Sequence, residues 1–151
     1  MAIRVVASDE QSDRPVDTER WAALAEAVLR DEAVEGDGEL SLTFVDEAAI
    51  AVLNEQYLGH GGPTDVLSFP IEDDPAEAGE LPVLLGDVVI CPEVAFRNAP
   101  DHAGTYEDEV ALLVVHGILH VLGMDHEDHD EADVMEAREQ VLLDAHHRAA
   151  P

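Results

Sequence analysis

The sequence predicts a single α+β domain, residues 1–151, in which helices cover a mixed four-stranded sheet. Four short segments rich in β-branched residues alternate with amphipathic stretches long enough to form helices. Whole helices separate some of the strands, and such connections join parallel pairs. The 46% hydrophobic content excludes wholesale disorder, and 151 residues form one domain that can bury about two-thirds of its unfolded surface. One helix stands out as long and apolar.

The first strand is expected at residues 3–7, which are short, apolar and β-branched. Asp17 is a plausible N-cap for a helix that continues to about Glu32, because apolar residues recur at intervals of three and four. The second strand is expected at residues 39–45, where apolar and polar residues alternate. The apolar residues of that alternation are Leu40, Leu42 and Phe44.

Asp46 is expected to cap a second helix, which ends at a glycine-rich turn before Pro63. Its inner face is predicted to carry Ile50, Leu53 and Tyr57. Two further strands are expected at residues 65–69 and 84–91. The acidic segment 72–80 between them is interpreted as a solvated loop, with a flap over a site as the alternative.

Pro92 opens a short helix that is expected to continue to about Asn98. The long apolar helix begins near Glu107, and Asp130 is predicted to cap the last helix. That last helix is expected to carry the apolar residues Val134, Met135, Val141 and Leu142. Residues 146–148, with the adjacent His146 and His147, are interpreted as a frayed and solvated tail.

The composition is strongly acidic, with 35 acidic and 7 basic residues and a formal net charge of −28. All seven basic residues are arginines. Such a surface repels polyanions over long distances, which by itself argues against a nucleic-acid partner. High salt weakens this repulsion, since the Debye length falls to about 3 Å at 1 M. An acidic, lysine-free surface suits a host with high internal salt, although a biased genome would also produce it.

Targeting and redox features are sparse. No apolar run approaches the roughly 20 residues of a membrane span, so no membrane partner is expected. The first residues lack a secretory signal, and the cytoplasm is the expected compartment. Cys91 is a lone cysteine at the end of an apolar run, and we expect a buried small hydrophobic residue there, not a nucleophile.

A histidine motif lies at the end of the long apolar helix. His116 and His120 are four residues apart, which places both side chains on one helix face. Gly123 lets the helix end, and His126 can then fold back as a third ligand. Two histidines at this spacing are by themselves more often core or surface residues, but the third histidine and the glycine favour a metal. Three nitrogen ligands leave a fourth tetrahedral position for water, as in catalytic zinc sites.

The motif resembles the H-E-x-x-H-x-x-G-x-x-H pattern of metzincin proteases, with Gly117 in place of the catalytic glutamate. Glycine cannot move a proton, so the motif lacks the protease base. Chemistry at a metal-bound water, with the metal as Lewis acid, remains open. The sequence therefore favours a metal-dependent hydrolase over a peptidase.

Other side chains near the motif are candidates for supporting roles. His129 is the main rival of His126 for the third ligand position, and Asp125 could orient an imidazole by accepting a hydrogen bond. Ser68 and Asp87 are candidates for lining a cleft, or else for capping turns. No protein side chain is assigned as the catalytic group, and the metal-bound water is the expected reactive species.

Three segments together resemble the YbeY family: HGILHVLGMDH at residues 116–126, PTDVLSFP at 63–70 and LGDVVIC at 85–91. The resemblance implies a single-strand-specific, metal-dependent endoribonuclease that acts in 16S ribosomal RNA 3′-end maturation and ribosome quality control. It also implies an α+β domain with a four-stranded sheet. The family's metal ligands, usually taken to bind zinc, fall on His116, His120 and His126, although another divalent transition metal could be loaded. Ribosomal RNA, the small ribosomal subunit and its assembly factors are the implied partners.

The chain departs from the family at one position. Where the family often has an arginine after the aromatic residue that closes the second helix, this chain has Leu58 after Tyr57. Stabilisation of transition-state charge could pass to His60, to Arg97 or to the metal. This departure keeps a second function open, a ribosome-assembly factor with a structural metal and no turnover. A metalloprotease is the third alternative.

Overall fold

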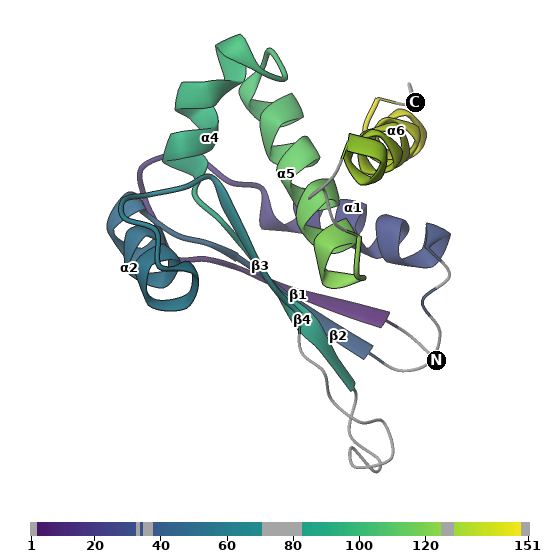
Figure 1. Ribbon diagram of the computed structural model, residues 1–151, viewed down its shortest axis with the longest axis horizontal. Helices are drawn as coiled ribbons and strands as arrows, with labels where there is room; N and C mark the ends of the chain where they lie inside the picture. Colours follow the sequence, from purple (N-terminus) through teal and green to yellow (C-terminus); the bar gives the residue numbers. More distant parts are fainter. Residues whose placement is uncertain (1–2, 33, 35–37, 71–82, 125–128, 149–151) are drawn as a thin grey trace.

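The predicted four-stranded mixed sheet is present in the computed structural model, which describes residues 3–32, 34, 38–70, 83–124 and 129–148 (Figure 1). Within these residues the strand order is β1-β2-β4-β3. The strands are β1 (Ile3–Asp9), β2 (Gly38–Phe44), β3 (Val66–Pro70) and β4 (Val83–Ile90). The β1–β2 and β2–β4 pairs are parallel, whereas β3 is an antiparallel edge strand. The fold class is therefore the α+β class that the sequence predicts.

The described residues contain five α-helices and one short 3-10 helix. They are α1 (Thr18–Asp31), α2 (Glu47–Leu58), α4 (Pro92–Asn98), η1 (Ala99–Asp101), α5 (Tyr106–Val121) and α6 (His129–His146). The predicted caps of the first two are confirmed, because Asp17 accepts a hydrogen bond from the Arg20 amide at 3.1 Å and Asp46 accepts one from the Ala49 amide at 2.8 Å. None of the described helices combines the length and hydropathy that a membrane span requires.

The sheet has a core on each face. The larger core lies between the sheet and helices α1, α5 and α6, and α2 covers the opposite face (Figure 1). Alternate residues of β2 are fully buried in the larger core, as the sequence alternation predicts. These residues are Leu40, Leu42 and Phe44. Cys91 is fully buried in the smaller core, and burial raises the pKa of its thiol, in keeping with a packing role.

Helix α2 differs from its prediction at Tyr57. Ile50 is buried as expected, but Tyr57 is 60% exposed and contacts Phe69 edge-on, with ring centroids 5.2 Å apart. The buried polar position of this helix is Asn54, whose side-chain amide donates to the Gly62 carbonyl at 3.1 Å. This hydrogen bond ties the glycine-rich turn to the helix, which explains why a polar side chain faces inward there.

Helix α5 is buried on nearly all sides, as its apolar sequence predicts. Its end is a Schellman motif, in which the Gly123 amide donates to the His120 carbonyl at 3.0 Å and the Met124 amide donates to the Leu119 carbonyl at 2.9 Å. Gly123 has φ +102°, a conformation that strongly favours glycine. The predicted helix stop at Gly123 is therefore confirmed.

At Gly117, helix α5 packs closely against the sheet. A Cβ atom at this position would lie 2.6 Å from Val88 Cγ1 and 3.2 Å from Ser68 Oγ. Ser68 also donates a hydrogen bond from its hydroxyl to the Gly117 carbonyl at 3.2 Å. A glutamate at position 117 would collide with β4, so the helix–sheet packing itself explains the absence of the protease base.

Helix α6 begins at His129, so Asp130 lies in its first turn and is not the cap that the sequence predicts. Of the four apolar residues expected in this helix, Val134 and Val141 are 60% and 54% exposed. The buried stripe runs instead through Met135, Glu139, Leu142 and Leu143. Glu139 thus lies in the middle of the buried face of α6, and the two valines lie outside that face.

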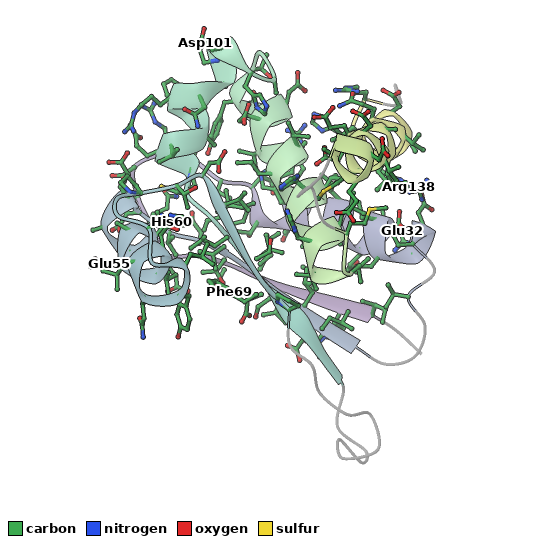
Figure 2. All side chains as sticks on the ribbon, in the orientation of Figure 1. Glu32, Glu55, His60, Phe69, Asp101 and Arg138 are labelled. Atoms are coloured by element: carbon green, nitrogen blue, oxygen red, sulfur yellow. The ribbon has the colours of Figure 1, made fainter. Side chains whose placement is uncertain are left out.

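The residues predicted as a solvated tail are instead attached to the domain. The ring of His146 bonds to Asp31 of α1, and His147 Nε2 lies 2.8 Å from Asp108 Oδ1 of α5. The His147 ring also lies near Trp21, with centroids 6.0 Å apart. The hydrogen bond from His147 lowers the pKa of the Asp108 carboxyl. Together with the ion pair of Arg138 and Glu32, visible in Figure 2, these contacts fasten α6 to α1 and α5.

We expect Gly117→Ala to destabilise the domain by about 1–3 kcal/mol, because the new methyl group overpacks the contact with Val88. In a helix, alanine is about 1 kcal/mol more favourable than glycine. We expect the steric loss to exceed this gain. Urea denaturation of Gly117→Ala, Val88→Ala and the double variant measures it, and the double variant should lose less than the sum of the single losses. Gly61→Ala, at a position with open space, is the matched control. Additive losses would contradict a steric contact between positions 117 and 88.

Candidate metal centre and adjacent cleft

The last two turns of α5 bring the predicted ligands His116 and His120 together. Their ring centroids lie 4.7 Å apart with an interplanar angle of 75°. Both residues are partly buried, whereas Ile118 and Leu119 between them are core residues. Two imidazoles at this separation and angle suit two corners of a tetrahedral zinc site.

A buried carboxylate from α6 holds the first of these rings. Glu139 is only 5% exposed, and its Oε2 atom lies 2.6 Å from His116 Nδ1. Because His116 Nδ1 bonds to Glu139, a metal would be bound through the other ring nitrogen, Nε2. Histidine ligands of metals commonly pass their other ring proton to a carboxylate, which fixes the tautomer and the orientation of the ring.

Glu139 is not among the candidates that the sequence motif indicates. The residue expected to orient an imidazole is Asp125, which lies outside the described residues. A signal was nevertheless present, because Glu139 lies four residues after Met135 and three before Leu142, on the apolar stripe of an amphipathic helix. A carboxylate on such a stripe needs a buried partner, and His116 is that partner.

The predicted third ligand is not among the described residues. His126 lies in the segment 125–128, and the side chain of its rival His129 is also outside the description. Within the described part of the chain, no three side chains of the histidine, cysteine, aspartate or glutamate type come together as a metal site. The set of three ligands and the choice of zinc therefore stay predictions, supported by the geometry of His116 and His120.

A cleft of 530 Å³ lies beside His116. Val66 of strand β3 lines one part of the cleft, and residues of α5 and α6 line most of the rest. Its polar lining includes Asp65, His102, His116, Glu136 and Glu139. Neither predicted cleft residue, Ser68 or Asp87, is in this lining: Ser68 bonds to the Gly117 carbonyl, and Asp87 lies on β4 opposite Phe69.

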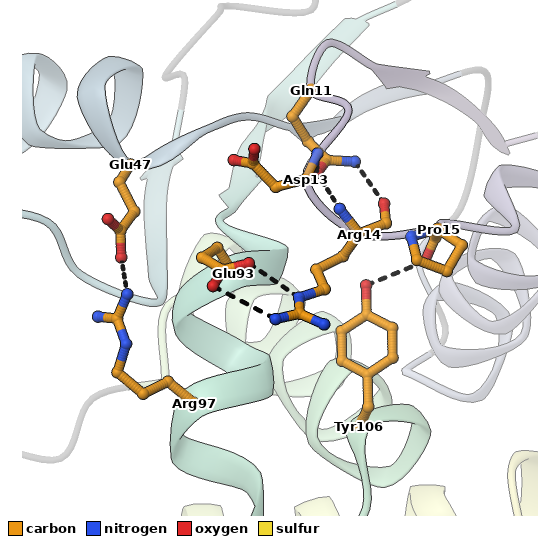
Figure 3. Close-up of polar contacts among 8 residues, drawn as sticks. All are labelled: Gln11, Asp13, Arg14, Pro15, Glu47, Glu93, Arg97 and Tyr106. Atoms are coloured by element: carbon orange, nitrogen blue, oxygen red, sulfur yellow. Dashed lines mark hydrogen bonds and ion pairs between the residues drawn. The ribbon is translucent and has the colours of Figure 1, made fainter.

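The candidates for the role of the family arginine lie elsewhere. Leu58 is exposed at the end of α2, and His60 follows it in the next turn (Figure 2). Arg97 forms an ion pair with Glu47 (Figure 3). Neither His60 nor Arg97 lines the cleft beside His116. Among the described residues, the ionisable groups that line this cleft are carboxylates and imidazoles, and no arginine is among them.

The nearby Arg14 is also paired, with its Nε atom 2.8 Å from Glu93 Oε2 (Figure 3). This hydrogen bond lowers the pKa of the Glu93 carboxyl. Tyr106 donates its hydroxyl proton to the Pro15 carbonyl at 3.0 Å, and burial, with the charge of Asp9, raises the pKa of its phenol to about 12. These groups join the loop between β1 and α1 to α4 and α5 and have a structural role.

Comparisons with known proteins match most of this chain. The family model described as Endoribonuclease YbeY matches residues 6–147. A protein of Beutenbergia cavernae named Endoribonuclease YbeY is 44% identical over 138 residues, covering 88% of this chain and 91% of the relative. A protein of the same name from Kineococcus radiotolerans is 47% identical over 137 residues, covering 87% of this chain and 78% of the relative. The solution structure of a Thermotoga maritima protein aligns with a TM-score of 0.60 and 27% identity, over 94% of this chain and 87% of the other.

Proposed function

Because the chain belongs to the YbeY family of endoribonucleases, we propose that it cleaves single-stranded ribosomal RNA at a zinc site formed by His116, His120 and His126. The chain is an endoribonuclease, a hydrolase with a metal-dependent role in ribosomal RNA processing. The observation that carries the proposed site is the contact between Glu139 and His116, beside a cleft large enough to admit substrate.

The donors in the described structure fit zinc. Two imidazoles lie close together on one helix face, and a buried carboxylate holds one of them by Nδ1. This is the donor set of zinc sites, in which neutral imidazole binds through one nitrogen while the other is hydrogen-bonded. Zinc supplies a Lewis acid that polarises a phosphoryl oxygen and lowers the pKa of water towards 7.

The protein's own residues have three tasks in this proposal. Glu139 keeps the His116 ring in one orientation, so that no reorganisation is needed when substrate arrives. Gly117 keeps α5 against β4, which fixes the position of both histidines relative to β3. The walls of the cleft, including Val66 and Leu112, exclude water around the bound phosphodiester. Selectivity for single strands follows if only a flexible backbone can enter the cleft.

The net charge of −28 makes the approach of RNA unfavourable at low salt. The proposal therefore includes the small ribosomal subunit or its assembly factors as partners that present the RNA, and the cytoplasm as the compartment in which they meet. An assembly factor without turnover is the second candidate, because Leu58 replaces a family arginine and the described cleft lining lacks one.

We expect the zinc-loaded protein to cut a single-stranded fragment from the 3′ end of small-subunit ribosomal RNA, more slowly at low salt than at molar salt. The same fragment annealed to its complement should resist cleavage. His116→Ala/His120→Ala, with its fold checked by circular dichroism, should be inactive, because two of the three proposed ligands are gone. Gel analysis of end-labelled RNA measures the cleavage. Absence of cleavage at either salt, with zinc bound and the fold intact, would favour the assembly factor.

We expect Glu139→Gln to weaken zinc binding by about tenfold to 100-fold, because the amide keeps the size of the side chain but loses the charge that orients His116. Competition with a chromophoric chelator measures the affinity. Glu136→Gln is the matched control, since it removes an exposed cleft carboxylate from the same helix. An unchanged zinc affinity in folded Glu139→Gln would contradict the assignment of His116 as a ligand.

A further inference from the structure

The part of the cleft next to His116 is formed by two helices. Glu139 of α6 holds the His116 ring, with Oε2 2.6 Å from Nδ1, and both residues line the cleft. Leu112 lies four residues before His116, and Met135 and Glu136 lie four and three residues before Glu139. Residues at these helical spacings share a face, with Cβ atoms about 5–6 Å apart. All three line the cleft, and we call them its near wall.

His102 belongs to a more distant part of the same cleft. Its Nδ1 atom lies 2.8 Å from Oε2 of Glu109, a fully buried carboxylate seven residues before His116 on α5. Seven residues of helix span about 10 Å. The side chains that can contact a nucleotide held at His116 are therefore those of the near wall, one helical turn away.

Apolar side chains supply much of the near wall. Leu112 is partly buried and Met135 is 2% exposed, and Val66 of β3 and Ala132 of α6 add further apolar surface to the cleft. The volume of 530 Å³ falls within the range of about 300–1,000 Å³ that is typical of small-molecule sites, which are mostly apolar with a few polar groups. In single-stranded RNA, the flat faces of the bases are the parts that pack on such side chains.

The polar groups of this region suit the edge of a base better than a phosphate. Glu136 is an exposed carboxylate in the cleft lining. Arg138 of the same helix pairs with Glu32 of α1, and Arg148 donates a hydrogen bond to Gln140 Oε1 at 2.7 Å. A phosphate beside Glu136 would meet a like charge, whereas the N–H groups of a base would meet an acceptor.

A carboxylate distinguishes between bases by the donors that they present, because it accepts at both oxygens. Guanine presents two neighbouring donors on its Watson–Crick edge, N1–H and the N2 amino group. Adenine, cytosine and uracil each present a donor next to an acceptor, so that one carboxylate oxygen would face an acceptor. Single-stranded RNA exposes these edges for recognition, and Glu136 therefore matches guanine best.

We propose that the near wall binds the base of a nucleotide next to the cleaved phosphodiester, and that Glu136 makes guanine the preferred base. The proposal rests on the endoribonuclease function proposed above. Leu112 and Met135 contact the faces of the base, and the two oxygens of Glu136 accept hydrogen bonds from N1 and N2. No bond is made or broken at this subsite, which determines instead which phosphodiester is placed at the histidines.

The first test measures binding without cleavage. Guanosine carries no charge, so the net charge of −28 does not oppose its binding. In the zinc-loaded protein with ¹³C-labelled methionine methyl groups, guanosine should shift the NMR signal of Met135 more than equal concentrations of adenosine, cytidine or uridine. Glu136→Gln should lose this preference, because the amide offers one donor and one acceptor. Asp133→Asn is the matched control, since Asp133 is exposed on the same helix outside the cleft lining, and it should keep the preference.

The second test measures the choice of cleavage site. At molar salt, products from a single-stranded RNA with a randomised segment should show guanine enriched at one position next to the cut. The expected enrichment is about 5-fold to 150-fold, the range in which a bidentate contact discriminates between bases. Inosine, which lacks the N2 amino group, should lower kcat/KM when it replaces that guanine. Glu136→Gln should lose the enrichment with its zinc content unchanged and cleavage at other bases retained.

Three results would overturn the guanine subsite. Two are equal shifts of the Met135 signal with all four nucleosides, and cleavage by the parent protein without a preferred neighbouring base. The third is an enrichment of guanine that Glu136→Gln retains. Guanosine binding that depends on Glu136, in a parent protein that does not cut RNA, would instead contradict the proposed function and support the subsite.

Discussion

Helix α5 lies directly on strand β4 because residue 117 has no side chain. The space that a Cβ would need is taken by Val88, and the Ser68 hydroxyl binds the Gly117 carbonyl from the neighbouring strand β3. This contact fixes the height of the helix above the sheet and its rotation about its own axis. His116, the residue before Gly117, is thereby directed to the cleft between β3, α5 and α6, and His120 follows one turn later. The same glycine that removes the protease base therefore positions the candidate ligands.

Buried carboxylates supply the second constraint. In a chain with 35 acidic residues, only Glu109 and Glu139 are buried among the described residues, and each has an imidazole as its partner. Leaving a buried charge unpaired typically costs 3–5 kcal/mol, so each carboxylate and its histidine must stay together. Two rings of the cleft are in this way held by the core, although the rings themselves are partly exposed. The arginines at the other end of the domain contribute differently, since Arg14 and Arg97 pair with glutamates and brace α4.

Much of the fold could be predicted because its signals are local. Asp17 and Asp46 cap helices where expected, Gly123 ends α5 in a left-handed conformation, and alternate residues of β2 are buried. The partner of Glu139 in α6 could not be predicted, because His116 is 23 residues away in the chain. His147 was misassigned to a solvated tail for the same reason, since its partner Asp108 is 39 residues away.

In the candidate site, too, local features could be predicted from the sequence and tertiary contacts could not. The spacing of His116 and His120 follows from helix geometry, so a sequence motif can reveal it. The groups that hold the cleft rings come from tertiary packing: Glu139 reaches across from α6, and Glu109 reaches back to the loop before α5. The position of Glu139 on the apolar stripe of α6 indicates that it has a buried partner, but nothing in the sequence identifies that partner as His116. Membership of the family indicates the reaction, RNA cleavage. The structure shows which carboxylates hold the histidines of the cleft.

The account depends on a metal bound by imidazole nitrogen at the end of α5. X-ray absorption at the zinc edge, recorded on the zinc-loaded protein and on His116→Ala/His120→Ala, tests this most directly. The account predicts a four-coordinate spectrum for the parent, with histidine nitrogens at about 2.0 Å, and loss of the histidine scattering in the variant. A six-coordinate shell of oxygen atoms in the parent, or an unchanged histidine signal in the variant, would contradict it.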